Sequence, residues 1–341
     1  MKILTICTVA IAALTINARA MAQATPIPAA APVDPTTFIN QFEATGGKFE
    51  GYRRSGAKGI CAAGEFVGSP EAKGLSTASV FSGKPVPVIV RFSIGGGNPR
   101  AADNAKSQRN LSLQFNLPDG ERWMMGNISA PVFGASTPQQ LLAGLVARQP
   151  DPATKTADPA KVKAFTDANP ETLLQGKHYA SQPVPASFGS VNYWGVHAHG
   201  FVNASGAKQF GKWIFEPVGG QQGLTDDEAK AKGANFLFDD LRQRVKDGKV
   251  GFNFNLELAQ AGDKLDSATV PLPEGRKKVN LGVLKITSVS EDGGGPCLTT
   301  NYNPMVMPKG VEASNDPMLA ARAAPYAVSL GRRLGEGAKQ Q

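Results

Sequence analysis

The sequence predicts an α+β protein in which an antiparallel β-barrel carries additional helices. Two observations lead to this fold class. The 341 residues include 38 Gly and 25 Pro, which interrupt the chain too often for a helical bundle or a coiled coil and favour many strands and loops. Strand-like segments also precede and follow the helical ones, and a last helix ends the chain, an order that suits a barrel with helical additions.

Six segments are predicted to be strands because they are short, rich in Val, Phe and Ile, and bounded by Gly, Pro or Asn. They are 86–92, 111–116, 191–202, 212–216, 251–258 and 279–288. The sequence Asn203-Ala-Ser-Gly206 predicts a turn between two of them. We therefore expect a hairpin over 195–216.

Helical signals are fewer. Residues 137–148 begin with Thr-Pro and place three leucines on one side. Thr225 and Glu228 form a capping box before an amphipathic stretch that ends near Gly248. The polar, Pro-rich segment 149–187 is expected to wrap the surface.

The last helix is expected to start at Asp316-Pro317 and to run towards Gly335. Pro325 lies inside this range. Because proline lacks an N–H and crowds the carbonyl four residues back, we expect the helix to be kinked or to begin later than Pro317.

Residues 1–24 are predicted to be a signal peptide, because a basic residue precedes an apolar stretch too short to span a bilayer of about 30 Å. Cleavage is expected after Ala20 or Ala24, followed by an extended spacer over 25–33 and one domain over 34–341. A buried N-terminal helix is the alternative. No later segment approaches 18 uninterrupted apolar residues, so the mature chain is not expected to insert into a membrane.

Charge and cysteine content exclude several functions. Lys and Arg exceed Asp and Glu by 36 − 28 = 8, but no run of five like charges occurs, so no nucleic-acid-binding tail is expected. A basic interior pocket for an acidic ligand is compatible with this excess. Three His, three Cys and no Cys-x-x-Cys exclude a zinc-finger array. Leader removal leaves Cys61 and Cys297, which could form a disulfide in an exported protein or remain as two buried thiols.

The face of the last helix is the most informative chemical feature. Arg322 and Tyr326 are four residues apart and Arg333 is seven further on, so all three fall within about 40° around a helix. A guanidinium one turn away favours the anionic form of a phenol. A phenolate is a hard anionic ligand, and Tyr is one of the few proximal ligands of haem iron.

Several motifs in a fixed order resemble the haem catalases, and most closely the smaller, exported catalase-related peroxidases. The motifs are Arg91-Phe92-Ser93, Ala102-Asp103, Asn127 with Pro131-Val132-Phe133, Gly195-Val196-His197, Val202-Asn203, Asn303-Pro304 with Met307-Pro308-x-Gly310, and Arg322-x-x-x-Tyr326 with Arg333-Leu334-Gly335. The resemblance runs from about Asp34 to Gly335. It implies an eight-stranded antiparallel barrel with flanking helices, a buried haem b and export to the periplasm.

The resemblance also implies roles for individual residues. Tyr326 would be the proximal ligand of the haem iron and Arg322 the cation that keeps it a phenolate. Three further arginines would pair with the haem propionates, which suits bidentate Arg–carboxylate geometry. They are Arg53, Arg91 and Arg333.

The distal side departs from the family pattern. The family segment Arg-x-x-His-Ala-Lys-Gly is Arg-Arg-Ser-Gly-Ala-Lys-Gly over 53–59 here, so Gly56 stands where the distal histidine should be. Ser93 matches the serine that holds that histidine. The distal asparagine is either Asn127, after the gain of one residue before Pro-Val-Phe, or is replaced by Ser129.

Two functions are consistent with this departure. A positioned general acid–base contributes about 10²–10⁴-fold, so without it catalase turnover should nearly vanish while slow peroxidase chemistry persists. The first function is therefore a periplasmic haem peroxidase for organic peroxides or hydrogen peroxide, with weakened activity and an unspecified electron donor. The second is a non-enzymatic haem-binding protein that stores, senses or scavenges haem. A monomer or dimer is expected, because the arms of the larger catalases are missing.

Overall fold

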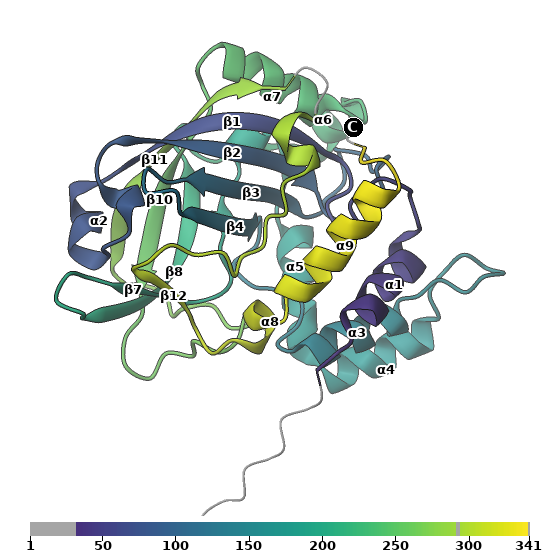
Figure 1. Cartoon of the computed structure of the whole chain (residues 1–341). Helices are drawn as coiled ribbons and strands as arrows, with labels where there is room; N and C mark the ends of the chain where they lie inside the picture. Colours follow the sequence, from purple (N-terminus) through teal and green to yellow (C-terminus); the bar gives the residue numbers. More distant parts are fainter. Residues whose placement is uncertain (1–31, 291–293, 340–341) are drawn as a thin grey trace, which may run out of the picture. The chain divides into compact units, whose positions relative to one another are not determined.

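Eight antiparallel strands close into a barrel (Figure 1), which confirms the predicted fold class. In order around the barrel they are β10 (Gly251–Leu258), β11 (Lys278–Val289), β1 (Gly59–Gly68), β2 (Pro85–Ile94), β3 (Arg109–Asn116), β4 (Arg122–Ile128), β6 (Tyr193–Trp194) and β8 (Lys208–Pro217). Pairing of β8 with β10 completes the ring. The computed structural model describes residues 32–290 and 294–339, so the predicted signal peptide and most of the spacer lie outside the described residues.

Side chains alternate along the barrel strands, with apolar residues pointing into the core and polar residues pointing outwards. Along β3, Leu111, Leu113 and Phe115 are fully buried in the barrel core, whereas Asn110 and Ser112, which precede the two leucines, are only half-buried. Successive side chains of a strand point to opposite faces, so Asn110 and Ser112 lie on the outer face.

The predicted strand over 191–202 is wrong, because the chain breaks there into β6 and β7 (His199–Val202). Gly195 follows β6 and packs tightly on Trp213, since a Cβ atom at this position would lie 2.1 Å from the indole Nε1. The predicted hairpin is confirmed over β7 and β8, with a backbone hydrogen bond from Gly206 to Asn203 in its turn.

Two strands of the barrel, β1 and β4, have no strand-like composition. The first is rich in Gly and Ala and the second contains two Met and a Gly. Each is held by partners on both sides, and such pairing outweighs intrinsic strand preference. Among the described residues, β7 lies outside the closed ring and pairs with β8, and three more short strands also lie outside it. They are β12 (Val311–Ala313), which pairs with β7, and the pair β5 (Val184–Pro185) and β9 (Gly223–Leu224).

The helices lie outside the barrel. They are α1 (Pro35–Gly46), α2 (Pro70–Leu75), α3 (Pro138–Ala147), α4 (Pro159–Ala168), α5 (Leu174–Ser181), α6 (Asp226–Ala231), α7 (Phe236–Lys246), α8 (Pro317–Ala320) and α9 (Ala323–Gly335). The helix predicted over 137–148 is confirmed as α3, and the side chain of Thr137 accepts the N–H of Gln140 as its cap. The segment 149–187 is largely exposed, as predicted, but it also forms α4 and α5. None of the helices in residues 32–290 and 294–339 is long and apolar enough to cross a membrane.

The stretch after Thr225 divides into two helices. The capping box is present at the start of α6. Helix α6 ends at Ala231, before the extended Lys232 and Gly233, a residue type common after helix ends. Beyond it, the Ala234 carbonyl accepts the Lys58 ammonium at 2.6 Å, and α7 starts where Asp103 accepts the N–H of Leu237 at 2.9 Å.

The C-terminal helix restarts as predicted. The short α8 is capped by Asp316, and α9 begins at Ala323, so Pro325 falls in its first turn. A first-turn N–H has no partner within the helix, so proline costs little there. Helix α9 crosses the outside of the barrel beside α1 (Figure 1).

Candidate active site

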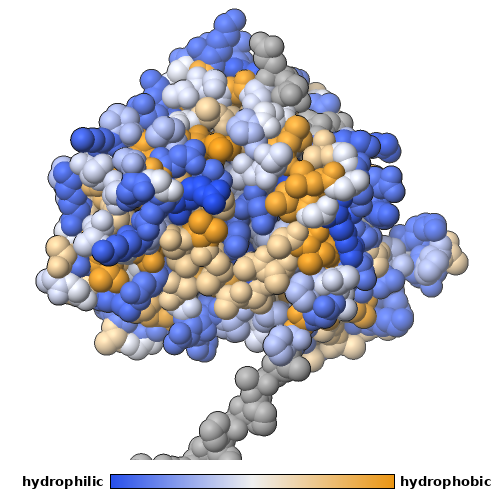
Figure 2. All heavy atoms as spheres, viewed as in Figure 1, coloured by the Kyte–Doolittle hydropathy of each residue, from blue (hydrophilic) through white to orange (hydrophobic). Residues whose placement is uncertain are grey.

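A cavity of about 510 Å³ separates α9 from the outer face of the barrel, a size typical of sites for small organic ligands. One wall is the face of α9 that carries Tyr326, Ser329, Leu330 and Arg333. Apolar side chains of α1 and α3, including Phe38, Phe42 and Leu141, form a second wall. Figure 2 shows hydrophobic side chains reaching the surface along and beside α9.

The barrel wall of the cavity consists of two rows that run across the strands. Directly paired residues of antiparallel strands point to the same face. The first row joins Ser93, Asn110 and Ile128 from β2, β3 and β4. The second row joins Arg91, Ser112 and Gly126. All six residues line the cavity.

The predicted Tyr326 and Arg322 pair comes together at one end of the cavity. The Arg322 Nη2 donates to the phenolic oxygen of Tyr326. Gly126 on β4 permits this approach, because a Cβ atom there would lie 2.9 Å from the same nitrogen. The structure therefore directs a guanidinium cation at the oxygen that the sequence predicts to be a metal ligand.

Two residues without an assigned role in the sequence hold Arg322 in place. Its Nη1 lies 3.3 Å from Nε2 of His197, and Nδ1 of His197 lies 2.7 Å from a carboxylate oxygen of Asp316. Burial lowers the pKa of His197, so the ring is neutral, with Nδ1–H donating to Asp316 and Nε2 accepting from Arg322. The signals were present, as His197 closes the Gly-Val-His motif and Asp316 precedes α8, but nothing local showed that they meet.

The three predicted propionate-binding arginines also line the cavity, from β2, α9 and the segment before β1. Arg333 is only 1% exposed, and within residues 32–290 and 294–339 neither of its terminal nitrogens has a hydrogen-bond partner. Burial, with a smaller contribution from the charge of Arg53, lowers the pKa of Arg333 to about 9. Burial likewise holds the pKa of Arg91 well below its usual value.

The cavity that these three arginines line is cationic. In the part of the chain that the structure describes, no Asp or Glu lines the cavity. A buried positive cluster of this kind is stabilised by an anionic ligand, and a guanidinium matches a carboxylate with two parallel hydrogen bonds. The donor set thus fits haem, with its two carboxylates, and Tyr326 supplies the oxygen that would bind its iron.

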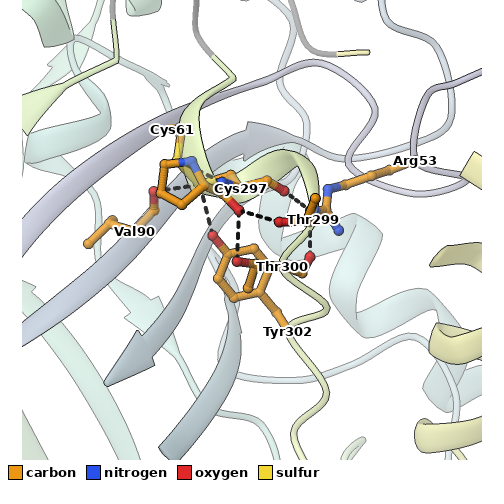
Figure 3. Close-up of a disulfide and its surroundings, with 8 residues drawn as sticks. Arg53, Cys61, Val90, Cys297, Thr299, Thr300 and Tyr302 are labelled. Carbon is orange, nitrogen blue, oxygen red and sulfur yellow. Dashed lines mark hydrogen bonds between the residues drawn. A yellow bond between two sulfur atoms is a disulfide. The ribbon is translucent and has the colours of Figure 1, made fainter. Parts of the chain in front are cut away.

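The chain segment that carries the disulfide-bonded Cys297 holds the Arg53 guanidinium in place (Figure 3). Cys61 of β1 and Cys297 form a disulfide, so the predicted bridge is confirmed and the two free thiols are excluded. The Arg53 Nη2 donates to the carbonyls of Cys297 at 2.7 Å and Thr300 at 2.9 Å. Tyr302, whose pKa burial raises to about 12, lies under the guanidinium and donates to the Cys297 sulfur.

Of the two predicted alternatives for the distal asparagine, Asn127 reaches the cavity and Ser129 does not. Asn127 touches the cavity, but its oxygen accepts the indole N–H of Trp213 at 2.7 Å and its nitrogen donates to the Leu111 carbonyl at 3.0 Å. Ser129 accepts the Arg109 backbone N–H and does not line the cavity. The next residue, the apolar Ile128, also lines the cavity and lies in the same row as Ser93.

The catalase class of proteins is defined by a helix with a tyrosine and an arginine that faces the outside of an eight-stranded barrel. A cationic cavity lies between this helix and the barrel. The catalase family model matches residues 51–340, and the chain belongs to this family. It is 40% identical to a catalase-related peroxidase of Synechococcus elongatus over 89% of this chain and 90% of that one. It is 31% identical to a catalase-related peroxidase of Mycolicibacterium paratuberculosis over 88% and 95% of the two chains.

Solved structures show the same fold. Catalase A from Saccharomyces cerevisiae superimposes with a TM-score of 0.75 at 21% identity, over 83% of this chain. The chain covers only 61% of that catalase. The relatives support a peroxidase- or catalase-type activity for the chain.

Proposed function

We propose that the chain is a haem b-dependent peroxidase that reduces organic peroxides or hydrogen peroxide in the periplasm, with weakened turnover. The observation that carries the proposal is the lining of one cavity. Three arginines and the Arg322–Tyr326 pair line it, and among the described residues no Asp or Glu does. A haem bound there would supply iron redox chemistry towards peroxide.

The chain itself contributes the binding and the electrostatics. Arg53, Arg91 and Arg333 would hold the two propionates. Arg322, fixed by His197, would donate a hydrogen bond to the Tyr326 oxygen, and that oxygen would bind the iron.

Weak turnover follows from the residues at the distal wall. A general acid–base at the distal wall would take a proton from the peroxide and return one to it. Gly56 provides no imidazole for either transfer. The side chains nearest to a Cβ atom at this position are those of Ser93, Asn110 and Arg91. Losing a general acid–base costs about 10²–10⁴-fold in rate.

The same glycine supports a second candidate function, a non-enzymatic haem-binding protein that stores, senses or scavenges haem. Peroxide-dependent dye oxidation separates the two candidates. The mature protein is loaded with haem, freed of excess haem, and compared with the same protein carrying Tyr326→Phe and with free haem at equal concentration. Turnover above both controls is expected, whereas rates equal to free haem would favour the second candidate.

The predicted leader and the disulfide support the periplasmic assignment. The predicted leader lies outside the described residues, but the Cys61–Cys297 disulfide is of a kind that persists in oxidising compartments. Cell fractionation and the mass of the mature chain test this directly. A chain that begins after residue 20 or 24 in the periplasmic fraction is expected, and an uncleaved cytoplasmic chain would contradict the assignment. Size-exclusion chromatography tests the expected monomer or dimer.

A further inference from the structure

We infer that Asn110 is the ligand-binding residue of the distal wall and takes the place that the missing histidine leaves at Gly56. The inference rests on the proposed haem site and specifies what that site binds. Asn110 lies on β3 in the same row as Ser93, facing the cavity across from α9.

The amide of Asn110 occupies the space that a side chain at residue 56 would enter. An ideal Cβ atom on Gly56 would lie 3.0 Å from the Ser93 hydroxyl and 3.5 Å from Nδ2 of Asn110. Ser93, which in the resemblance holds the distal histidine, here accepts a hydrogen bond from that Nδ2 at 3.1 Å. The serine is thus already engaged by a different polar side chain.

The orientation of Asn110 is fixed from both ends. Its Oδ1 accepts Nε2–H of Gln108 at 2.5 Å, and Oε1 of Gln108 in turn accepts the hydroxyl of Tyr179 at 3.2 Å. The chain of donors runs from Tyr179 through Gln108 and Asn110 to Ser93. Each amide nitrogen carries two hydrogens, and no hydrogen bond within residues 32–290 and 294–339 takes the second one on Nδ2 of Asn110.

This arrangement selects a class of ligand. A carboxamide donates a hydrogen bond but does not exchange a proton near neutral pH, and the Asn110 oxygen is held by Gln108 while, within the described residues, its nitrogen keeps a free hydrogen. The site therefore favours small anions or lone-pair-bearing ligands that accept one hydrogen bond. It holds a peroxide oxygen in place without helping its protonation.

Fluoride is a suitable probe because, bound to ferric haem, it is a compact anionic acceptor. Haem-loaded parent, Asn110→Ala and Asn110→Leu proteins are titrated with fluoride and followed by absorbance. Hydrogen bonds to charged groups are strong enough that both variants should bind fluoride about 10- to 100-fold more weakly. Asn116→Ala, on the same strand but away from the cavity, is the matched control and should retain parental affinity.

Ser93→Ala and Gln108→Ala keep the amide and remove one anchor each, so they test positioning even if an Asn110 variant fails to fold. We expect smaller losses, within about tenfold. The carbon monoxide stretch of the ferrous protein should also rise in Asn110→Leu and stay unchanged in Asn116→Ala, because a nearby N–H donor lowers it.

The outcomes separate this inference from the proposed function. Haem binding with equal fluoride affinity in the Asn110 variants and the Asn116 control would overturn the role of Asn110 and leave the haem site intact. Failure of every protein, the parent included, to bind haem would overturn both.

Discussion

The disulfide should stabilise the fold strongly, because it joins two points that are far apart in the chain. Cys61 and Cys297 are separated by 236 residues. In the chain-entropy model, closing a loop of this length removes about 18 cal/mol/K from the unfolded state, or about 5.5 kcal/mol at 25 °C. Because real unfolded chains are compact, this value is an upper estimate.

The perturbation is the double variant Cys61→Ala/Cys297→Ala, with Cys61→Ser/Cys297→Ser as the matched control. The serine pair removes the covalent link but leaves a side-chain oxygen that can accept the Tyr302 hydroxyl, which in the parent donates to the Cys297 sulfur. We expect the serine pair to lose about 3–5 kcal/mol of unfolding free energy. The alanine pair should lose about 1 kcal/mol more, because the buried hydroxyl then has no acceptor.

Urea unfolding, followed by tryptophan fluorescence, measures both losses. The slope of free energy against urea should also increase, because the unfolded chain without the bridge exposes more surface. A serine pair that unfolds within about 1 kcal/mol of the parent would refute the chain-entropy reasoning for this bridge. Haem affinity is a separate readout, since Arg53 is held by carbonyls of the bridged segment.

Three further predictions concern the cavity. Tyr326→Phe should lose most of its haem or its phenolate-type ferric spectrum, and an unchanged spectrum and haem content would disprove the ligand assignment. Because the pKa of Arg333 is about 9 in the free protein and an anionic ligand raises it, haem affinity should be constant below pH 9 and fall as the pH rises above it. Arg333→Met should bind haem more weakly without this fall, and a parental pH profile in that variant would contradict the cause. Gly56 has a φ of +65°, which strains histidine, and Asn110 fills the space beside it. Gly56→His/Asn110→Gly should therefore react with peroxide about 10²–10⁴-fold faster than the parent, more than Gly56→His alone. If the folded, haem-loaded double variant is no faster, the missing imidazole does not limit the rate.

Some features follow from the sequence because their physical cause is local. Residues four and seven apart share a helix face whatever surrounds them, so the α9 face with Arg322, Tyr326 and Arg333 could be predicted. Thr137 caps α3 through its own neighbouring N–H groups. Pro325 predicted an irregularity in the last helix because a proline ring restricts only the adjacent turn, which is also a local effect.

The tertiary structure decided the features that depend on strand register. Register determines which face each residue occupies, and a shift of one residue reverses it. Asn127 is paired with Leu111, so its amide bonds inside the wall to Trp213, and Ile128 faces the cavity instead. No local pattern distinguishes these two residues.

Tertiary structure also decided which residues meet at the distal wall and which residues hold Arg322 beside Tyr326. The sequence by itself showed that Gly56 lacks an imidazole, and it gave no indication that Asn110 fills the space. These residues are 54 positions apart in the chain and meet only because β1, β2 and β3 pair side by side. The pairing of His197 with Asp316, over 119 positions, likewise depends on barrel closure and on where α8 begins. Contacts between distant segments arise from the packing of the whole chain, which is why only the folded structure reveals them.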